Sequence, residues 1–330
     1  MNVKETVLKT LAESGGQFFS GAALAKAVGV SRNAVWKAVK ALEADGYAIE
    51  SVTGKGYRLS ESNNRLDEII IGRGLETHYI GRKIVLLESV DSTNNYAKEL
   101  ASHGAESGTA VIAETQSSGK GRLGRTFVSP KGSGLYVTVI IRPKLDIADA
   151  QLITSCAAVA AAEAVESISG NEVGIKWVND LYMNGRKICG ILTEASLSLE
   201  TTSLDYAVIG IGINVRSVKE AFEPELLERA SSIEDETGFR ADRNALCSEL
   251  LNRLEVHLDR ITEREFIPEY RRREILTGNM ITAKIKGKPT VGKAVGIDEN
   301  ANLLMELENG NICSVNCGEA NLCRIVRQGD

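Results

Sequence analysis

The chain contains 330 residues, of which 43% are hydrophobic and 25% are charged, and its formal net charge is −5 at pH 7. This length accommodates two or three domains, and this composition excludes a disordered or fibrous chain. We expect no membrane span, because no apolar run is long enough, and no secretory signal, because the N-terminus is charged and amphipathic. We therefore expect a cytoplasmic protein without a membrane partner.

The charge is distributed unevenly along the chain. Residues 1–60 contain eight Lys and Arg against five Asp and Glu, which gives this part a net charge of +3 and leaves −8 for the rest. The two parts are therefore expected to meet different partners, and the basic part is a candidate for binding nucleic acid.

Residues 20–46 are predicted to form two helices joined by a tight turn at Gly29, with Ser31 as the N-cap of the second helix. This is the spacing of a helix-turn-helix. On the second helix, Val35, Val39 and Leu42 fall on one face, and polar and cationic side chains fall on the opposite face. The outer face can therefore contact DNA.

Two short alternating segments, 47–52 and 56–60, follow these helices and predict a β-hairpin with Lys55 at its tip. Helices followed by a basic hairpin indicate a winged helix, whose second helix reads the major groove while the wing contacts phosphate. The alternative is a small protein-interaction domain with a solvated charged face. We prefer DNA, and the residues expected to contact it are Ser31, Arg32, Asn33, Trp36, Lys37, Lys40 and Lys55. The polar residues 60–68 are expected to form a linker.

The segment 83–90 predicts a buried strand that leads into a helix beginning near Asp91–Asn94. Ser92 or Thr93 is expected to cap this helix. The same polar helix start also offers donors and acceptors to a small polar ligand.

Residues 116–136 combine glycines with the cations Lys120, Arg122 and Arg125. Gly119, Gly121 and Gly124 fit the dinucleotide pattern G-x-G-x-x-G, but no helix is predicted after them, so that interpretation fails. Such a loop suits a polyanion, because glycine lets the backbone approach phosphate and arginine grips its oxygens. The alternative is a mobile, solvated surface loop.

Further along, 148–170 predicts an Ala-rich core helix, and Lys176 lies in an otherwise apolar strand. A buried ammonium needs an anionic partner, which is either Asp180 or a ligand. The Asn-Gly-Arg run at 184–186 predicts a hairpin turn. Gly210 and Gly212 interrupt the next apolar strand at a point where another group must come close.

Helices are expected at about 241–273, and a small all-β barrel is expected at 279–330. The six cysteines are expected to be reduced thiols. Cys313, Cys317 and Cys323 cluster in the C-terminal part, but their spacing does not match a zinc pattern, so we expect no metal site there.

Four of these motifs together resemble the bifunctional biotin protein ligases, which are also biotin operon repressors. The motifs are DSTN at 91–94, Q-x-x-G-[RK]-G-R-x-G-R from Gln116, KWVND at 176–180 and GIGINV at 210–215. Two positions depart from the family pattern. Val178 replaces a proline, and Lys120 stands where arginine is common, which keeps the charge but loses the bidentate fork.

The resemblance covers nearly the whole chain and implies an α+β multidomain fold. It implies a winged helix-turn-helix domain at 1–62, a central mixed α/β ligase domain similar to class II synthetases at 63–278, and a C-terminal SH3-like β-barrel at 279–330. It assigns catalysis to Arg122 and Lys176, biotin binding to Ser92, Thr93, Asn94, Gln116, Lys120, Gly121, Arg122 and Lys176, and ATP and adenylate binding to Gly119, Lys120, Arg122, Arg125, Phe127, Asn179 and Asn214.

The activity that the resemblance implies is ATP-dependent formation of biotinyl-5′-AMP, with Mg²⁺ as the companion of ATP, followed by transfer of biotin to a lysine of the biotin carboxyl carrier protein of acetyl-CoA carboxylase. Operator DNA is the second partner, and the adenylate-bound form is expected to be a homodimer. Two alternatives remain. One is a ligand-sensing regulator without catalysis, and the other is a lipoate ligase, against which stand the winged helix and the absence of an Arg-Arg-x-x-Gly-Gly run.

Overall fold

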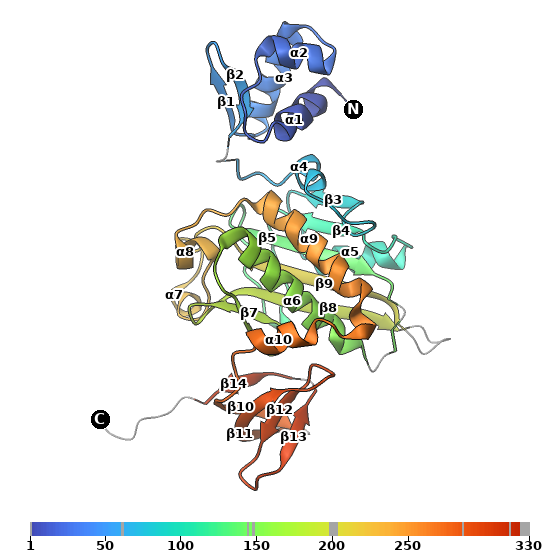
Figure 1. Ribbon diagram of the computed structural model, residues 1–330, viewed down its shortest axis with the longest axis vertical. Coiled ribbons are helices and arrows are strands. Elements are labelled where there is room, and N and C mark those ends of the chain that lie inside the picture. The colour runs from blue at the N-terminus through green and yellow to red at the C-terminus, as the bar shows by residue number, and fades with distance from the viewer. Residues whose placement is uncertain are drawn as a thin grey trace, which may run out of the picture.

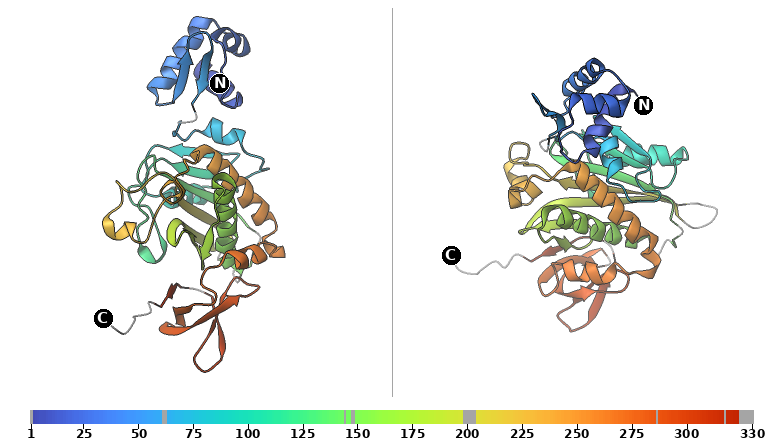
Figure 2. Two further views of the ribbon diagram at one scale, coloured as in Figure 1. Left: turned by 60° about the vertical axis from the view of Figure 1, so that its left-hand side comes forward. Right: turned by 45° about the horizontal axis from the view of Figure 1, so that its top comes forward.

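The computed structural model describes residues 2–60, 63–143, 145–146, 149–197, 204–285, 287–316 and 318–323. Three units follow one another along the long axis of the molecule (Figure 1). The N-terminal helices and the C-terminal small sheet lie at opposite ends of a large central unit, as two further views also show (Figure 2).

The N-terminal unit is the predicted helix-turn-helix followed by a hairpin. Its elements are α1 (Val3–Glu13), α2 (Gly21–Val28), α3 (Arg32–Ala44), β1 (Ile49–Val52) and β2 (Gly56–Leu59). Gly29 ends α2 in the left-handed conformation with φ 75°, and Ser31 caps α3 by accepting a hydrogen bond from the Ala34 backbone N–H. Val35, Val39 and Leu42 are buried against the other two helices, so the predicted inner face of α3 is confirmed.

The polar segment predicted to be a linker is partly buried from Asn63 onward. Residues 61–62 lie outside the described residues, whereas Asn63, Leu66 and Asp67 are buried. Asp67 caps α4 (Glu68–Arg73) and accepts a hydrogen bond from the Tyr47 hydroxyl of the N-terminal unit. The buried polar residues of this junction therefore have specific hydrogen-bond partners.

A seven-stranded mixed sheet forms the central unit, in the order β3-β4-β5-β9-β8-β7-β6. The strands are β3 (Ile84–Leu87), β4 (Ala110–Ala113), β5 (Gly134–Ile141), β6 (Gly174–Lys176), β7 (Asp180–Met183), β8 (Arg186–Leu197) and β9 (Leu204–Asn214). Among these seven strands, as far as the structure describes them, only the β3-β4 pair is parallel. Helix α5 (Thr93–Ser102) packs on one face of the sheet, and α6 (Ala150–Ser169) and α9 (Arg243–Asp259) cover the other face (Figure 1).

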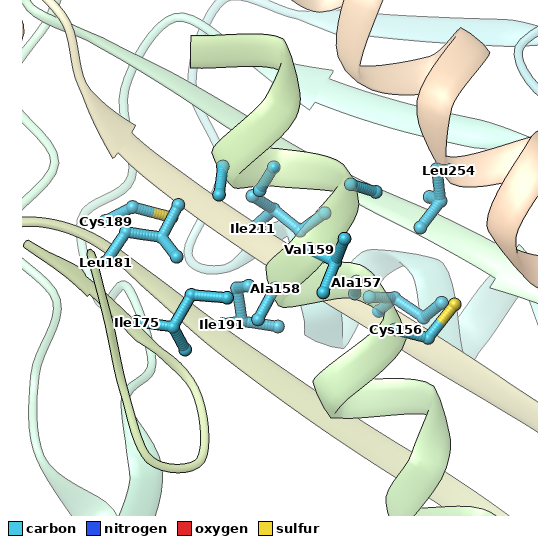
Figure 3. Packing of buried hydrophobic residues seen from close by; sticks show 14 of the residues in the cluster. Cys156, Ala157, Ala158, Val159, Ile175, Leu181, Cys189, Ile191, Ile211 and Leu254 are labelled. Carbon is cyan, nitrogen blue, oxygen red and sulfur yellow. The ribbon is translucent and has the colours of Figure 1, made fainter. Parts of the chain in front are cut away.

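Helix α6 is the core helix predicted from its alanines. Its Cys156, Ala157 and Val159 are fully buried, and α6 lies between the sheet and Leu254 of α9 (Figure 3). By length and composition alone α6 could cross a membrane, so the expectation that no apolar run is long enough was wrong. The helix is apolar because it packs inside the protein, where 67% of its most apolar window is buried.

The C-terminal sheet is antiparallel and has the order β13-β12-β11-β10-β14. Its strands are β10 (Met280–Ile285), β11 (Lys288–Ile297), β12 (Leu303–Glu306), β13 (Ile312–Val315) and β14 (Ala320–Leu322). Within the described residues β13 and β14 are the two edges, so the expected closed barrel is not observed. The remaining short elements are η1 (Arg122–Gly124), α7 (Pro224–Leu227), α8 (Ile233–Thr237), η3 (Ile261–Glu263) and α10 (Ile267–Arg273).

Candidate functional site

A cavity of about 560 Å³ lies where one end of the central sheet meets the C-terminal sheet. Cations from four segments line it: Arg122, Arg125, Lys176, Lys187 and Arg229. Two carboxylates, Asp180 and Glu319, also line it. Because cations outnumber carboxylates, the cavity favours an anionic ligand.

The Gly/Arg loop enters this cavity as a closed hairpin. The Gly121 N–H donates to the Arg125 carbonyl at 2.7 Å, and the Phe127 N–H donates to the Gly119 carbonyl at 2.8 Å. A single 3₁₀ turn, η1, forms the tip. The next element is the strand β5, so the prediction that no helix follows the motif is confirmed.

Both arginines of the hairpin contact groups outside it. Arg122 donates to Asn179 Oδ1 and to the Gly318 carbonyl, each at 2.9 Å. Arg125 forms a bidentate ion pair with the Glu319 carboxylate, with N–O distances of 2.6 and 2.8 Å. Arg122 is therefore held by neutral groups, and its charge is available to a ligand.

Lys176 lines the cavity, and its ammonium donates to Asn321 Oδ1 at 3.0 Å. Asp180, the partner considered from the sequence, forms its ion pair with Lys187 at 2.7 Å instead. Among the residues that the structure describes, Lys176 forms no ion pair. Burial lowers the pKa of Lys176, and the nearby Asp180 and Glu319 oppose that shift.

Lys187 and Arg229 were missed in the sequence analysis. Lys187 stands opposite Tyr182 in the β7-β8 hairpin, so the Asn184-Gly185 turn brings it back beside Asp180. That register is the signal that could have identified it. Arg229 comes from the segment after β9, and no local pattern points to it.

A smaller compartment opens at the start of α5. Ser92 occupies the N-cap position, as expected, but its side chain forms no capping hydrogen bond. Gln116 provides this bond instead, because its Oε1 accepts from the Thr93 N–H at 2.8 Å and from the Thr93 hydroxyl at 3.0 Å. The Thr138 hydroxyl on β5 donates to Asn94 Oδ1 at 2.8 Å.

The glycines of β9 are sites of close approach, as predicted. A Cβ on Gly210 would lie 2.0 Å from Asn94 Oδ1, and a Cβ on Gly212 would lie 2.6 Å from the Phe127 ring. Lys120 of the hairpin donates to Asn95 Oδ1 at 2.5 Å. The DSTN, Gly/Arg and GIGINV motifs therefore meet in one compartment.

Two asparagines connect the strands to the cavity. Asn179 Nδ2 donates to the Ile191 carbonyl, while its Oδ1 accepts from Arg122. Asn214 Nδ2 donates to the Ser231 carbonyl, but its buried Oδ1 has no hydrogen-bond partner among the described residues. An orphaned acceptor on a cavity wall suits a donor on a ligand.

The predicted DNA-contacting residues gather on α3 and the wing. Arg32, Asn33 and Trp36 line a groove with wing residues 51–54, and Trp36 is 50% exposed. The hydroxyl of Ser31 is used in capping, and Lys40 forms an ion pair with Glu43. The remaining two are Lys37, which is exposed on α3, and Lys55, which lies in the wing turn with its ammonium 5.9 Å above the Phe18 ring.

Known proteins share both parts of this arrangement. The model of the Biotin/lipoate A/B protein ligase family matches residues 86–214, and that of an HTH domain matches residues 3–58. The bifunctional ligase/repressor BirA of Bacillus subtilis is 33% identical over 311 residues, which cover 93% of this chain and 95% of that protein. The chain belongs to this bifunctional ligase/repressor family. BirA of Escherichia coli is 33% identical over 299 residues and 89% of each chain.

Solved structures agree with this assignment. A biotin protein ligase from Aquifex aeolicus in complex with biotin and ATP has a TM-score of 0.63 and 29% identity, over 74% of this chain and 99% of that one. The two family models separate the predicted site residues of this bifunctional ligase/repressor into two sets. Those predicted for the ligase, from Ser92 to Asn214, lie within 86–214, and those predicted for DNA, from Ser31 to Lys55, lie within 3–58. Gly318, Glu319 and Asn321 contact the site from outside both ranges.

Proposed function

We propose that this chain is an ATP-dependent biotin protein ligase that forms biotinyl-5′-AMP and transfers biotin to a lysine of the biotin carboxyl carrier protein, and that it also represses biotin synthesis genes. The observation that carries the proposal is a site with two adjoining compartments. One is small and lined by Ser92, Thr93, Asn94 and Gln116, and the other is large and cationic. Phe127 lines both.

The small compartment suits the ring of biotin, and the large one suits ATP. Hydroxyl and amide groups at the start of α5 offer both donors and acceptors to a urea-like group. The orphaned Asn214 Oδ1 suits an amino group such as that of adenine. The biotin carboxylate would then lie between the compartments, near Lys120 and Arg122.

The cations explain how the first step can occur. A biotin carboxylate oxygen attacks the α-phosphorus of ATP, a new P–O bond forms, and the bond to pyrophosphate breaks. Two anions must approach each other, and negative charge builds on the phosphate oxygens. Arg122, Lys176 and Lys187 face that charge, which makes electrostatic stabilisation the main contribution of the protein.

Mg²⁺ would enter with ATP. The described residues contain no group of three His, Cys, Asp or Glu side chains that could hold a metal alone. Mg²⁺ is usually bound by substrate phosphates and one or two carboxylates, and Asp180 and Glu319 line the cavity. When bound, the ion neutralises phosphate charge, and the Asp180 carboxylate would orient it.

In the second step the ε-amine of the acceptor lysine attacks the acyl carbon of the adenylate. An amide forms, AMP leaves, and the amine loses a proton. The mixed anhydride reacts with water, so the hairpin 119–127 would protect it by covering the site until the acceptor arrives.

Pyrophosphate exchange tests the ligase directly. The purified chain is incubated with ATP and labelled pyrophosphate, together with biotin, lipoate or neither. Exchange only in the mixture that contains biotin supports the proposal. Exchange with lipoate would identify a lipoate ligase, and no exchange in any mixture would leave a ligand-sensing regulator without catalysis.

Arg122→Ala is expected to release biotinyl-AMP at least ten-fold faster than the parent chain. The side chain lies in the middle of the hairpin with no anionic partner among the described residues, and a charge-assisted hydrogen bond contributes about 1.5–3 kcal/mol. Dissociation of labelled adenylate is the measurement. Leu123→Ala is the control, because this neighbour is 71% exposed and should not change the rate. An unchanged rate in Arg122→Ala would remove this residue from the site.

Lys176→Ala is expected to abolish most pyrophosphate exchange while leaving the melting temperature within a few degrees of the parent. Its only described hydrogen bond goes to a neutral amide, so little stability depends on it. Lys83→Ala, an exposed lysine before β3, controls for general effects of losing a charge. A large loss of stability with normal exchange would show that Lys176 has a structural role.

We infer further that the domain boundaries fall at 1–62, 63–278 and 279–330, that the central domain is similar to class II synthetases, and that the C-terminal sheet, which is open within the described residues, has an SH3-like fold. The separate two-, seven- and five-stranded sheets support these divisions. The adenylate-bound form is proposed to be a homodimer, because helix-turn-helix proteins bind paired half-sites as dimers. The proposed binding of operator DNA and of a carrier protein also supports a cytoplasmic location.

A further inference from the structure

The Phe127 ring lies inside the site, at the base of the hairpin. A Cβ on Gly212 would lie 2.6 Å from this ring, and a Cβ on Gly190 would lie 3.3 Å from it, so the ring rests directly on β8 and β9. It also meets the buried Tyr136 edge-on, with 6.3 Å between ring centroids. The two glycines therefore leave space that an aromatic side chain of the same protein fills.

Very little space remains beside this ring. The compartment lined by Ser92, Asn94, Gln116 and Gly210 holds only about 20 Å³, which is room for about one water molecule. The adjoining cavity, by contrast, holds about 560 Å³. A bicyclic ligand ring therefore fits the small compartment only after Phe127 has moved.

The polar groups of the small compartment are also occupied. Gln116 accepts two hydrogen bonds from Thr93 and donates to Ser129 Oγ at 2.8 Å. Asn94 donates to the Leu192 carbonyl and to Glu194. The chain thus satisfies internally both the shape and the hydrogen bonding of the compartment.

We infer that Phe127 occupies the biotin-ring compartment of the free chain and that biotin binds by displacing this ring. The inference rests on the proposed function, because it takes biotin as the ligand of the small compartment. Phe127 is then a gating residue. The ring opposes ligand entry because it fills the space above Gly190 and Gly212, and its backbone N–H is bonded to the Gly119 carbonyl of the hairpin.

A Phe127→Trp variant reports on the position of the ring. The parent chain contains two tryptophans, Trp36 and Trp177, whose signal is subtracted by using the parent under the same conditions. In the free variant the added indole should be shielded from acrylamide. Saturating biotin without ATP should increase its quenching and shift its emission to longer wavelength. Unchanged quenching at a biotin concentration shown to saturate the variant would overturn the inference.

Phe127→Ala tests the same idea without a larger side chain. Removing a ring that biotin must expel should raise the association rate constant of labelled biotin by about ten-fold or more. Leu123→Ala is the matched control, since this residue of the same hairpin is 71% exposed, lines neither compartment and should leave the rate unchanged. Equal rates in the parent and Phe127→Ala would contradict a gate. If the parent itself bound no biotin, the proposed function would fail, and that outcome is distinct from normal biotin binding with an immobile ring.

Discussion

Arg243→Met is expected to lower the free energy of unfolding by about 3–5 kcal/mol, because it leaves a buried carboxylate without its partner. The Arg243 side chain is 1% exposed and forms an ion pair with Glu114 at 2.9 Å. It also donates to the Gly134 carbonyl at 2.9 Å and to Asn64 Oδ1 at 3.0 Å. Methionine keeps much of the volume but replaces none of these bonds.

Urea unfolding of the parent and the variant measures the effect. Arg240→Met is the control, because Arg240 is 71% exposed and pairs with Glu234 at the surface, where such a pair contributes about 0–1 kcal/mol. Replacing Glu114 by Leu in the Arg243→Met background should recover part of the loss, since the unpaired charge is then removed. A loss below about 1 kcal/mol in Arg243→Met would show that the pair is not buried as described.

The position of this pair connects stability to the site. Glu114 directly follows β4 and precedes the Gly/Arg loop, while Gly134 begins the strand after that loop. Arg243 therefore fixes both ends of the loop whose tip carries Arg122. The same side chain holds Asn64, so the junction with the N-terminal unit shares the network.

Local features could be predicted from the sequence because their cause is local. The inner face of α3 follows from helical periodicity, and the β7-β8 hairpin follows from Asn184-Gly185, both of which have positive φ. The close approach at Gly210 and Gly212 was also predicted, because a missing side chain in a strand needs a reason. Only the structure identifies the side chains that approach these glycines, which are Asn94 and Phe127.

The contacts that could not be predicted join residues far apart in the chain. Arg243 looks like an ordinary first-turn residue of a helix, and only the fold buries it beside Glu114. Asn321 and Glu319 reach Lys176 and Arg125 from the C-terminal sheet, and no motif in that sheet marks them. A pattern indicates which chemistry a segment can perform, whereas the partner of each group depends on topology.

Biotinyl-AMP is expected to raise the affinity of the protein for its operator by about 5- to 150-fold, corresponding to a coupling free energy of 1–3 kcal/mol. One N-terminal unit presents a single reading helix and a net charge of +3 over residues 1–60. This is a small surface for a specific site at physiological salt, and a dimer would double it. Any ligand that favours the dimer therefore strengthens operator binding.

The central unit is the proposed dimer interface. The adenylate would hold the hairpin 119–127 and the segment after β9, which line the same cavity, in one fixed and ordered arrangement. Ordering these segments in advance reduces the entropic cost of association, so ligand and dimer must favour each other reciprocally. Transfer of biotin to unmodified acceptor consumes the adenylate, which would release the DNA and link repression to the demand for biotin.

A gel shift on the operator upstream of the protein's own gene measures this coupling in three conditions: with biotin plus ATP, with biotin alone and without ligand. Sedimentation under the same conditions reports the oligomeric state. Lys37→Ala is the matched control. Lys37 is an exposed cation on α3, so its loss should weaken binding in all three conditions and leave the ratio between them unchanged. Equal operator affinity in all three conditions, or tight binding by a monomer, would contradict the coupling and leave a ligase that carries an independent DNA-binding domain.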